Sequence, residues 1–326
     1  MVMVIAPILS TLTPASQVAG KESPVETFKI TDIPQAMDTL GWSEGARVMR
    51  KWFSGAAYEL PKDVKEGKSS PNNLAADNLL TDLPFDWLFT SSTRVRDDVE
   101  ELVAELSNVT EFSGTVGRLK TPLDQLSRGL IMLMTRLKRI GHLDLNANTL
   151  HNAYEDFSDL SAIQLEETSQ FNLIRIGAST WEKATDDLDD VYGALGSFAI
   201  KIAATKFRTI SNDHGYPAIQ ILEIGLYIRD TYDFLNVGPD QLLGYWSNSG
   251  VIRPGPIDYY TRPDFIDQGE TRYFKVTNDS FNSYRKKHGK GGDFLIFSTV
   301  KRYPVSILVH LSANDFEEFK ARASSI

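Results

Sequence analysis

The chain has 326 residues, of which 42% are apolar and 24% are charged. This length corresponds to about two domains or one large domain with a helical appendage, and the composition excludes a wholly disordered chain. The formal net charge of -9 argues against a general nucleic-acid binder. The chain has no cysteine, which excludes disulfides, thiolate metal sites and a cysteine nucleophile.

Residues 1–27 are predicted to form a flexible leader. The apolar start from Met1 to Leu9 is far shorter than the roughly 20 residues that span a bilayer. It also lacks the basic residues that open a signal peptide. The alternative interpretation is a recognition segment for a carrier. No segment of the sequence is expected to span a membrane.

Residues 28–143 are predicted to form a helical domain, with each helix indicated by a capping residue or a proline at its start. The predicted helices begin at Ile33, Ser43, Thr93 and Thr121. The last two have long apolar stripes at helical spacing. Such stripes suit either a partner groove or a core. The absence of sustained heptads favours the core.

Residues 144–191 are predicted to form an acidic junction. The stretch from 144 to 190 holds eleven Asp or Glu residues and only two basic residues. Its spacing lacks the glycine and the distant glutamate of a calcium loop. We therefore interpret it as a solvated hinge between two domains.

Residues 192–326 are predicted to form a β-rich domain. Apolar residues alternate at 198–202, 219–228 and 305–311, and 294–297 is a continuous apolar run. A final helix is predicted from Ser312. The fold class is therefore α+β, with an N-terminal helical region, a mainly antiparallel sheet and a closing C-terminal helix.

The first candidate site follows the strand around Ile228. Asp230 and Asp233 are two acids three residues apart, and Tyr245 and Trp246 belong to an aromatic cluster nearby. Paired acids at a strand end could hold a metal or transfer protons. The alternative is structural, with the acids forming turns and the aromatic residues filling the core.

The second candidate site is a glycine-rich turn in the chain's one basic zone. Its candidate residues are Arg285, Lys286, Lys287, His288, Lys290 and Asp293. Glycines there could expose backbone N–H groups, and the cations favour an anion such as phosphate. The alternative is a solvated turn or a surface that matches the acidic junction.

Motifs for a P-loop, a dinucleotide-binding loop and a Gly-x-Ser-x-Gly nucleophile elbow are absent. The five histidines are scattered and show no metal-binding spacing. We expect no metal and no cofactor.

Several blocks of the sequence resemble one bacterial family. They include Gly41-Trp42-x3-Ala46-x2-Met49-Arg50-x-Trp52-Phe53-x-Gly55, Tyr227-Ile228-Arg229-Asp230-x-Tyr232-Asp233-Phe234, Leu243-Gly244-Tyr245-Trp246 and His288-Gly289-Lys290-Gly291-Gly292-Asp293. Over about residues 28–311 the chain is similar to the uncharacterised domain of unknown function 6402. The family has no assigned activity. The resemblance implies a gene context beside type VI secretion spike, tip and toxin genes in Gram-negative bacteria.

From this resemblance we expect a non-enzymatic adaptor or chaperone for a type VI secretion effector. Its partner would be an effector toxin or a spike-tip protein, met in the cytoplasm of the producing bacterium. The binding residues would be Arg285, Lys286, Lys287, His288 and Lys290 of the basic turn, together with Tyr245 and Trp246. The alternative is a toxin of interbacterial competition, exported through the secretion system, such as a nuclease or another hydrolase. Its catalytic residues would be Asp230, Asp233, His288, Lys290 and Asp293. Nucleic acid is expected as a partner only in that case.

Overall fold

The computed structural model describes residues 28–108, 111–113, 126–142, 154–176, 188–211, 217–236 and 238–310, together with positions 314, 317, 318 and 321. The predicted leader 1–27 lies outside these residues, as do most positions of the predicted C-terminal helix from Ser312. None of the helices in the described ranges is long and apolar enough to cross a membrane.

The described residues form helices and two sheets, which confirms the α+β class. The helices are α1 (Ile33–Thr39), α2 (Ser43–Ser54), α3 (Lys62–Lys65), α4 (Trp87–Ser91), α5 (Thr93–Asn108), α6 (Leu126–Arg139), α7 (Ala162–Thr168), α9 (Asp190–Leu195), α10 (Pro256–Thr261) and α11 (Asn278–His288). Three of the four predicted starts are therefore matched. The fourth, Thr121, lies outside the described residues.

The larger sheet is built around one long strand. Its strands are β1 (Leu79–Leu83), β2 (Glu111–Ser113), β3 (Tyr154–Asp156), β4 (Gln170–Ile176), β5 (Phe198–Ser211), β6 (Pro217–Tyr232), β11 (Phe294–Ser298) and β12 (Lys301–His310). One edge of β6 pairs with β5, and the other edge pairs with β12 and then β11. Gly225 lies in β6 where a Cβ would approach Val300 and Thr205 within 3 Å, so a close packing contact explains this glycine.

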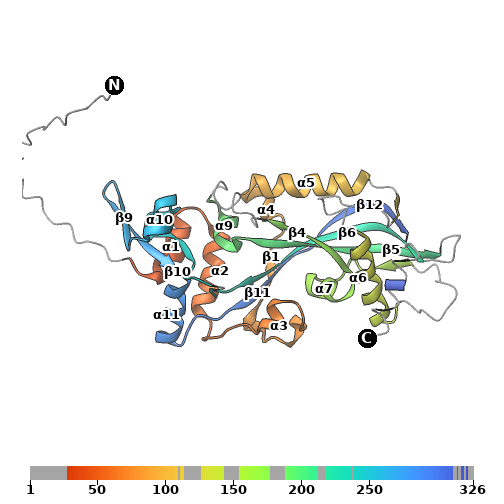
Figure 1. Ribbon diagram of the computed structural model, residues 1–326, viewed down its shortest axis with the longest axis horizontal. Helices are drawn as coiled ribbons and strands as arrows, with labels where there is room; N and C mark the ends of the chain where they lie inside the picture. The colour runs from red at the N-terminus through yellow and green to blue at the C-terminus, as the bar shows by residue number, and fades with distance from the viewer. Residues whose placement is uncertain are drawn as a thin grey trace, which may run out of the picture.

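The smaller sheet is antiparallel in the order β8-β7-β10-β9 among the described residues. Its strands are β7 (Leu242–Ser247), β8 (Gly250–Ile252), β9 (Phe265–Gln268) and β10 (Thr271–Thr277). Figure 1 shows this sheet with α10 and α11 at one end of an elongated molecule, while β5, β6 and β12 extend toward the other end. Helices α4 and α5 lie on one side of the larger sheet, and α3, α6 and α7 lie on the opposite side.

Two features of the sheet correct the sequence prediction. The larger sheet is mixed, because β1 runs parallel to β11 and β2 runs parallel to β12. Both of these strands come from residues 28–143, which were predicted to be helical only. Apolar periodicity identifies strands but not their partners, and parallel pairing needs a long connection that leaves no local sequence signal.

The predicted acidic junction is also ordered where it is described. Residues 154–176 contain β3, α7 and β4, and Phe171 and Leu165 are buried. This part is therefore an element of the larger sheet and its helical cover, not a solvated hinge. The exact domain boundaries at 143 and 191 stay a prediction.

Candidate functional site

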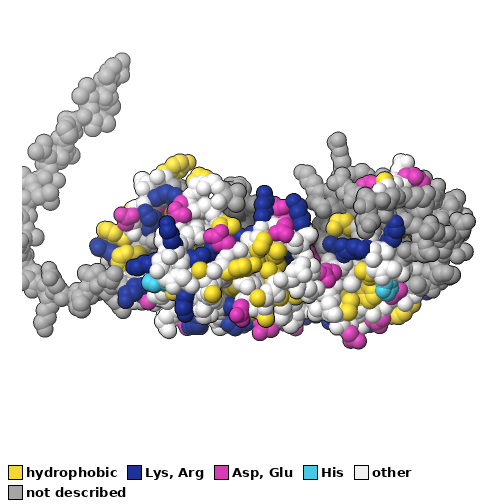
Figure 2. Space-filling view, turned by 90° about the horizontal axis from the view of Figure 1, so that it is seen from below, with side chains coloured by type: hydrophobic (Ala, Val, Ile, Leu, Met, Phe, Trp, Pro, Cys, Tyr) yellow, Lys and Arg dark blue, Asp and Glu magenta, His cyan; other side chains and the backbone are white. Residues whose placement is uncertain are grey.

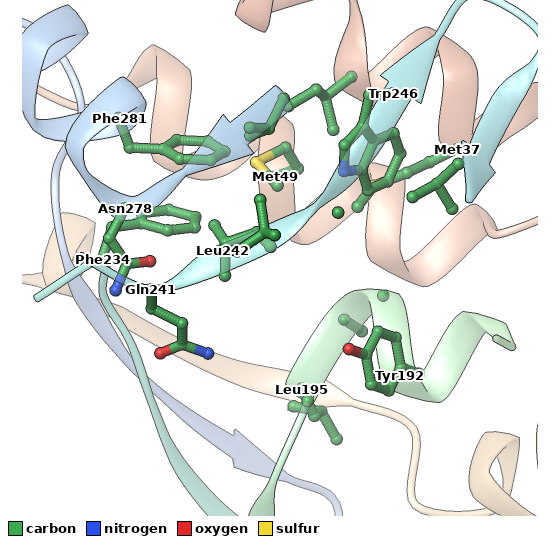
Figure 3. A pocket seen from close by; sticks show the side chains of 18 of the residues that line it. Met37, Met49, Tyr192, Leu195, Phe234, Gln241, Leu242, Trp246, Asn278 and Phe281 are labelled. Carbon is green, nitrogen blue, oxygen red and sulfur yellow. The ribbon is translucent and has the colours of Figure 1, made fainter. Parts of the chain in front are cut away.

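A pocket of about 360 Å³ lies where the helices meet the smaller sheet and the end of β6. Figure 3 shows side chains from several distant parts of the chain converging on it. The labelled lining residues are Met37 and Met49 from α1 and α2, Tyr192 and Leu195 from α9, Phe234 and Gln241 after β6, Leu242 and Trp246 from β7, and Asn278 and Phe281 from α11. Most of these labelled residues are apolar, and Asp230, Asp233 and Arg253 add charged groups to the lining.

The carboxylate of Asp190 fixes two walls of this pocket relative to each other. One oxygen accepts a hydrogen bond from the Gly45 backbone N–H at 2.7 Å, and the other accepts from the Glu44 N–H at 3.2 Å and from Trp87 Nε1 at 2.9 Å. Asp190 therefore caps the start of α2, where an anion is stabilised by the unpaired N–H groups and the helix dipole. Because Asp190 also begins α9, the cap holds α9 against α2. It lies in the stretch predicted to be solvated, yet it is buried.

Trp246 lies in the wall formed by β7. Its side chain is only 6% exposed and packs edge-on against Trp42, with ring centroids 6.3 Å apart. The indole Nε1–H is buried and no described group accepts a hydrogen bond from it. Its neighbour Tyr245 is also buried but does not line the pocket, because successive side chains on a strand point to opposite faces.

Asp230 contributes a carboxyl group to the pocket from the end of β6. Desolvation raises its pKa to about 8, and repulsion from Asp233 adds to this, while a backbone hydrogen bond from Thr231 and the charge of Arg229 oppose it. The carboxyl group is therefore largely protonated at neutral pH. Its chemistry therefore differs from that of an ordinary aspartate.

Asp233 also lines the pocket but is held by structural contacts. Its carboxylate forms an ion pair with Lys65 at 3.1 Å and accepts a hydrogen bond from the Leu235 N–H at 3.1 Å. The second contact is the turn bond that sequence reasoning gave as the structural alternative for this acid. The two acids of the first candidate site therefore differ in their surroundings.

The glycine turn after α11 is an internal anchor. Gly291 N–H donates to the Gly55 carbonyl at 3.0 Å, and Gly292 N–H donates to the Trp52 carbonyl at 3.1 Å. Gly291 has φ +100°, and a Cβ there would lie 2.4 Å from the Trp52 ring. The prediction that these glycines expose N–H groups to an anion is wrong, because α2 uses those groups and occupies that space.

Arg285 and Asp293 complete this anchor and are both buried. Arg285 Nε donates to the Gly291 carbonyl at 2.8 Å, and its Nη2 forms an ion pair with Asp293. Asp293 also accepts a hydrogen bond from Trp52 Nε1 at 3.1 Å. Burial raises the pKa of Asp293, although the charge of Arg285 and the bond from Trp52 oppose that shift. These two candidate residues therefore hold α11 to α2.

The remaining basic-turn residues, Lys286, Lys287, His288 and Lys290, are exposed. The His288 ring lies 4.6 Å from the Tyr284 ring. None of the basic-turn candidates lines the pocket, so the structure does not bring the five proposed catalytic residues to one place. Within the described residues, no group of three or more His, Asp or Glu side chains could hold a metal ion.

Sequence reasoning identified Asp230, Asp233 and Trp246 but missed the helical wall of the pocket. Met37, Met49, Tyr192 and Leu195 were assigned to helices or left unassigned, because an apolar side chain at a pocket and one in a core give the same periodicity. The unpaired indole N–H also has no sequence signal.

The chain was compared with curated proteins, solved structures and family models. No curated protein and no solved structure matches the chain significantly. The model of a family described as a family of unknown function (DUF6402) matches residues 28–311, which include every pocket-lining residue. The chain therefore belongs to the DUF6402 family.

Proposed function

We propose that this chain is a non-enzymatic adaptor that binds a partner protein by accepting an apolar side chain of the partner into the pocket. The observation that supports this is a pocket with an apolar wall, formed by residues such as Met37, Met49 and Leu242, that is bordered by exposed apolar residues. Leu235 lines the pocket and is partly exposed. Helix α10 begins two residues after Pro254, another lining residue.

Two side chains of α10 are unusually open to solvent for their size. Ile257 is 73% exposed and Tyr260 is 91% exposed. Figure 2 shows hydrophobic side chains among Lys and Arg at the left end of the molecule, where Figure 1 places α10 and β9. Exposed apolar side chains next to a pocket are typical of protein-binding surfaces. A partner segment could therefore enter the pocket and rest on α10.

The identity of the partner is proposed from the family resemblance alone. On that ground the partner is a type VI secretion effector or a spike-tip protein, bound in the cytoplasm of the producing bacterium. Charge complementarity between the partner and the exposed lysines at the same end of the molecule would raise the association rate.

The test is complex formation between the full chain and the products of the genes that flank its own. We expect one of these proteins to co-elute with the wild type. Leu243→Trp, which fills the pocket with a larger side chain, should abolish the complex. Leu173→Trp makes the same change on β4 away from the pocket and should preserve it. Elution of the wild type alone, or a complex that survives Leu243→Trp, would contradict the proposal.

The raised pKa of Asp230 favours one alternative function, a toxin that uses this carboxyl group as a general acid. In that case expression of the chain should kill a bacterial host, and Asp230→Asn should restore growth with the protein still folded. Harmless expression in both cytoplasm and periplasm would exclude this alternative.

A further inference from the structure

The indole N–H of Trp246 is unusual, because buried donors normally have an acceptor. Two other tryptophans follow this rule. Trp52 Nε1 donates to Asp293 at 3.1 Å, and Trp87 Nε1 donates to Asp190 at 2.9 Å. Trp246 Nε1 is equally buried but meets no acceptor among the described residues. Its N–H is therefore a hydrogen-bond donor that the described part of the chain leaves unused.

The backbone next to this N–H is a glycine. Gly244 lines the pocket and has φ +127°, a backbone conformation that favours glycine. A Cβ at this position would lie 3.4 Å from Trp246 Nε1 and 3.0 Å from a Val251 methyl group. A side chain at 244 would therefore cover the donor. Figure 3 shows the nitrogen on the edge of the ring nearest Met49 and Leu242, two other lining residues.

Charged groups of both signs line the pocket. Asp230, Asp233 and Arg253 all belong to the lining, and Asp233 is paired with Lys65. The Asp230 carboxyl group is largely protonated at neutral pH and can act as a second donor. Met37, Met49 and Leu242 offer only apolar contact. Two donors beside these apolar side chains suit an apolar group with an acceptor oxygen.

We infer that the pocket binds an apolar group that bears a carbonyl-type acceptor, and that Trp246 Nε1–H donates a hydrogen bond to that acceptor. In a protein partner this group would be an apolar side chain with its neighbouring main-chain carbonyl. The inference rests on the proposed function, since it names the chemistry recognised by the same pocket. Trp246 is thereby a specificity-determining residue.

The experiment compares two small probes of similar shape on the full-length protein. Acetophenone has a carbonyl oxygen, and cumene lacks any acceptor. One net hydrogen bond corresponds to roughly a fivefold change in affinity, so acetophenone should bind roughly five times more tightly than cumene. In ¹⁵N-edited spectra, acetophenone but not cumene should shift the Trp246 indole N–H resonance downfield.

Two variants separate the donor from the packing. Trp246→Phe keeps an aromatic ring but removes the N–H, so it should remove the preference for acetophenone over cumene. Tyr245→Phe is the matched control, because it removes a neighbouring buried hydroxyl that also has no acceptor but lies outside the pocket. It should leave both affinities unchanged.

Equal affinity for acetophenone and cumene in the wild type would overturn the inference, and so would failure of both to bind. Neither result decides the proposed function, which depends on complex formation and the Leu243→Trp variant. If Trp246→Phe does not fold, the wild-type affinities and the indole resonance still decide the question.

Discussion

The protonation of Asp230 is part of the folding equilibrium, because its carboxyl group loses water on folding. Its pKa is about 8 in the folded chain, against 3.8 for an ordinary aspartate. At a pH between these two pKa values, the folded state binds more protons at this site than the unfolded state does. The site's contribution to the free energy of unfolding is therefore fully present below about pH 4 and decreases as the pH rises to about 8.

Asp230→Asn should remove this pH dependence, because the amide is neutral at every pH. Relative to the wild type, the variant should become more stable as the pH rises from 5 to 8.5. We expect a gain of about 1–3 kcal/mol, since water in the pocket screens part of the full effect. Urea unfolding of both proteins at the two pH values measures it. A difference in stability that does not change with pH would contradict the raised pKa.

The anchor formed by Arg285 and Asp293 should stabilise the folded chain. Asp293→Ala removes the buried carboxylate partner of Arg285, which keeps only the exposed Glu59, and it leaves Trp52 without its acceptor. We expect a loss of roughly 3–5 kcal/mol in the free energy of unfolding. Lys290→Ala, in the same turn but exposed, should change it by less than about 0.5 kcal/mol. Equal effects of the two substitutions in chemical denaturation would show that Asp293 is not an anchor.

At the scale of elements, the start of α2 depends on a residue far away in the sequence. Asp190→Ala removes three hydrogen bonds that reach Gly45, Glu44 and Trp87. The expected loss of stability is about 2 kcal/mol, typical of a charged helix cap. Asp97→Ala in α5, where the side chain is 65% exposed, is the control and should have little effect. Thermal unfolding of both variants measures the difference, and equal melting temperatures would exclude the cap.

The sequence predicted local elements better than their assembly. The starts of α1, α2 and α5 and the cores of β5, β6, β11 and β12 follow from caps and periodicity. Asp190 looked solvated because it belongs to a run of acids, and its role depends on Gly45, which lies 145 residues away in the chain. The same reason applies to the glycine turn, since the need for Gly291 comes from Trp52 on α2. Long-range contacts of this kind leave no pattern in a single sequence.

At the scale of the whole molecule, the core is shared between the predicted helical and β-rich domains. A single cluster of buried side chains includes Trp52 from α2, Val99 from α5, Ile228 from β6 and Ile296 from β11. β1 also supplies an edge strand next to β11. The pocket is formed at this shared interface, with walls from both parts. A partner that fills the pocket would therefore stabilise the contact between them.

Because the core is shared, residues 28–143 and 192–326 should not fold when each is produced alone. Each fragment would expose the apolar face that normally covers the other, and the first would leave β1 without its partner strand. The full chain should unfold in one transition. Tryptophan fluorescence should report the same midpoint as far-ultraviolet circular dichroism, because Trp42, Trp52 and Trp246 lie on both sides of the predicted boundary. Cooperative unfolding of either isolated fragment, or two separate midpoints in the full chain, would show instead that the predicted boundaries divide the protein into independent domains.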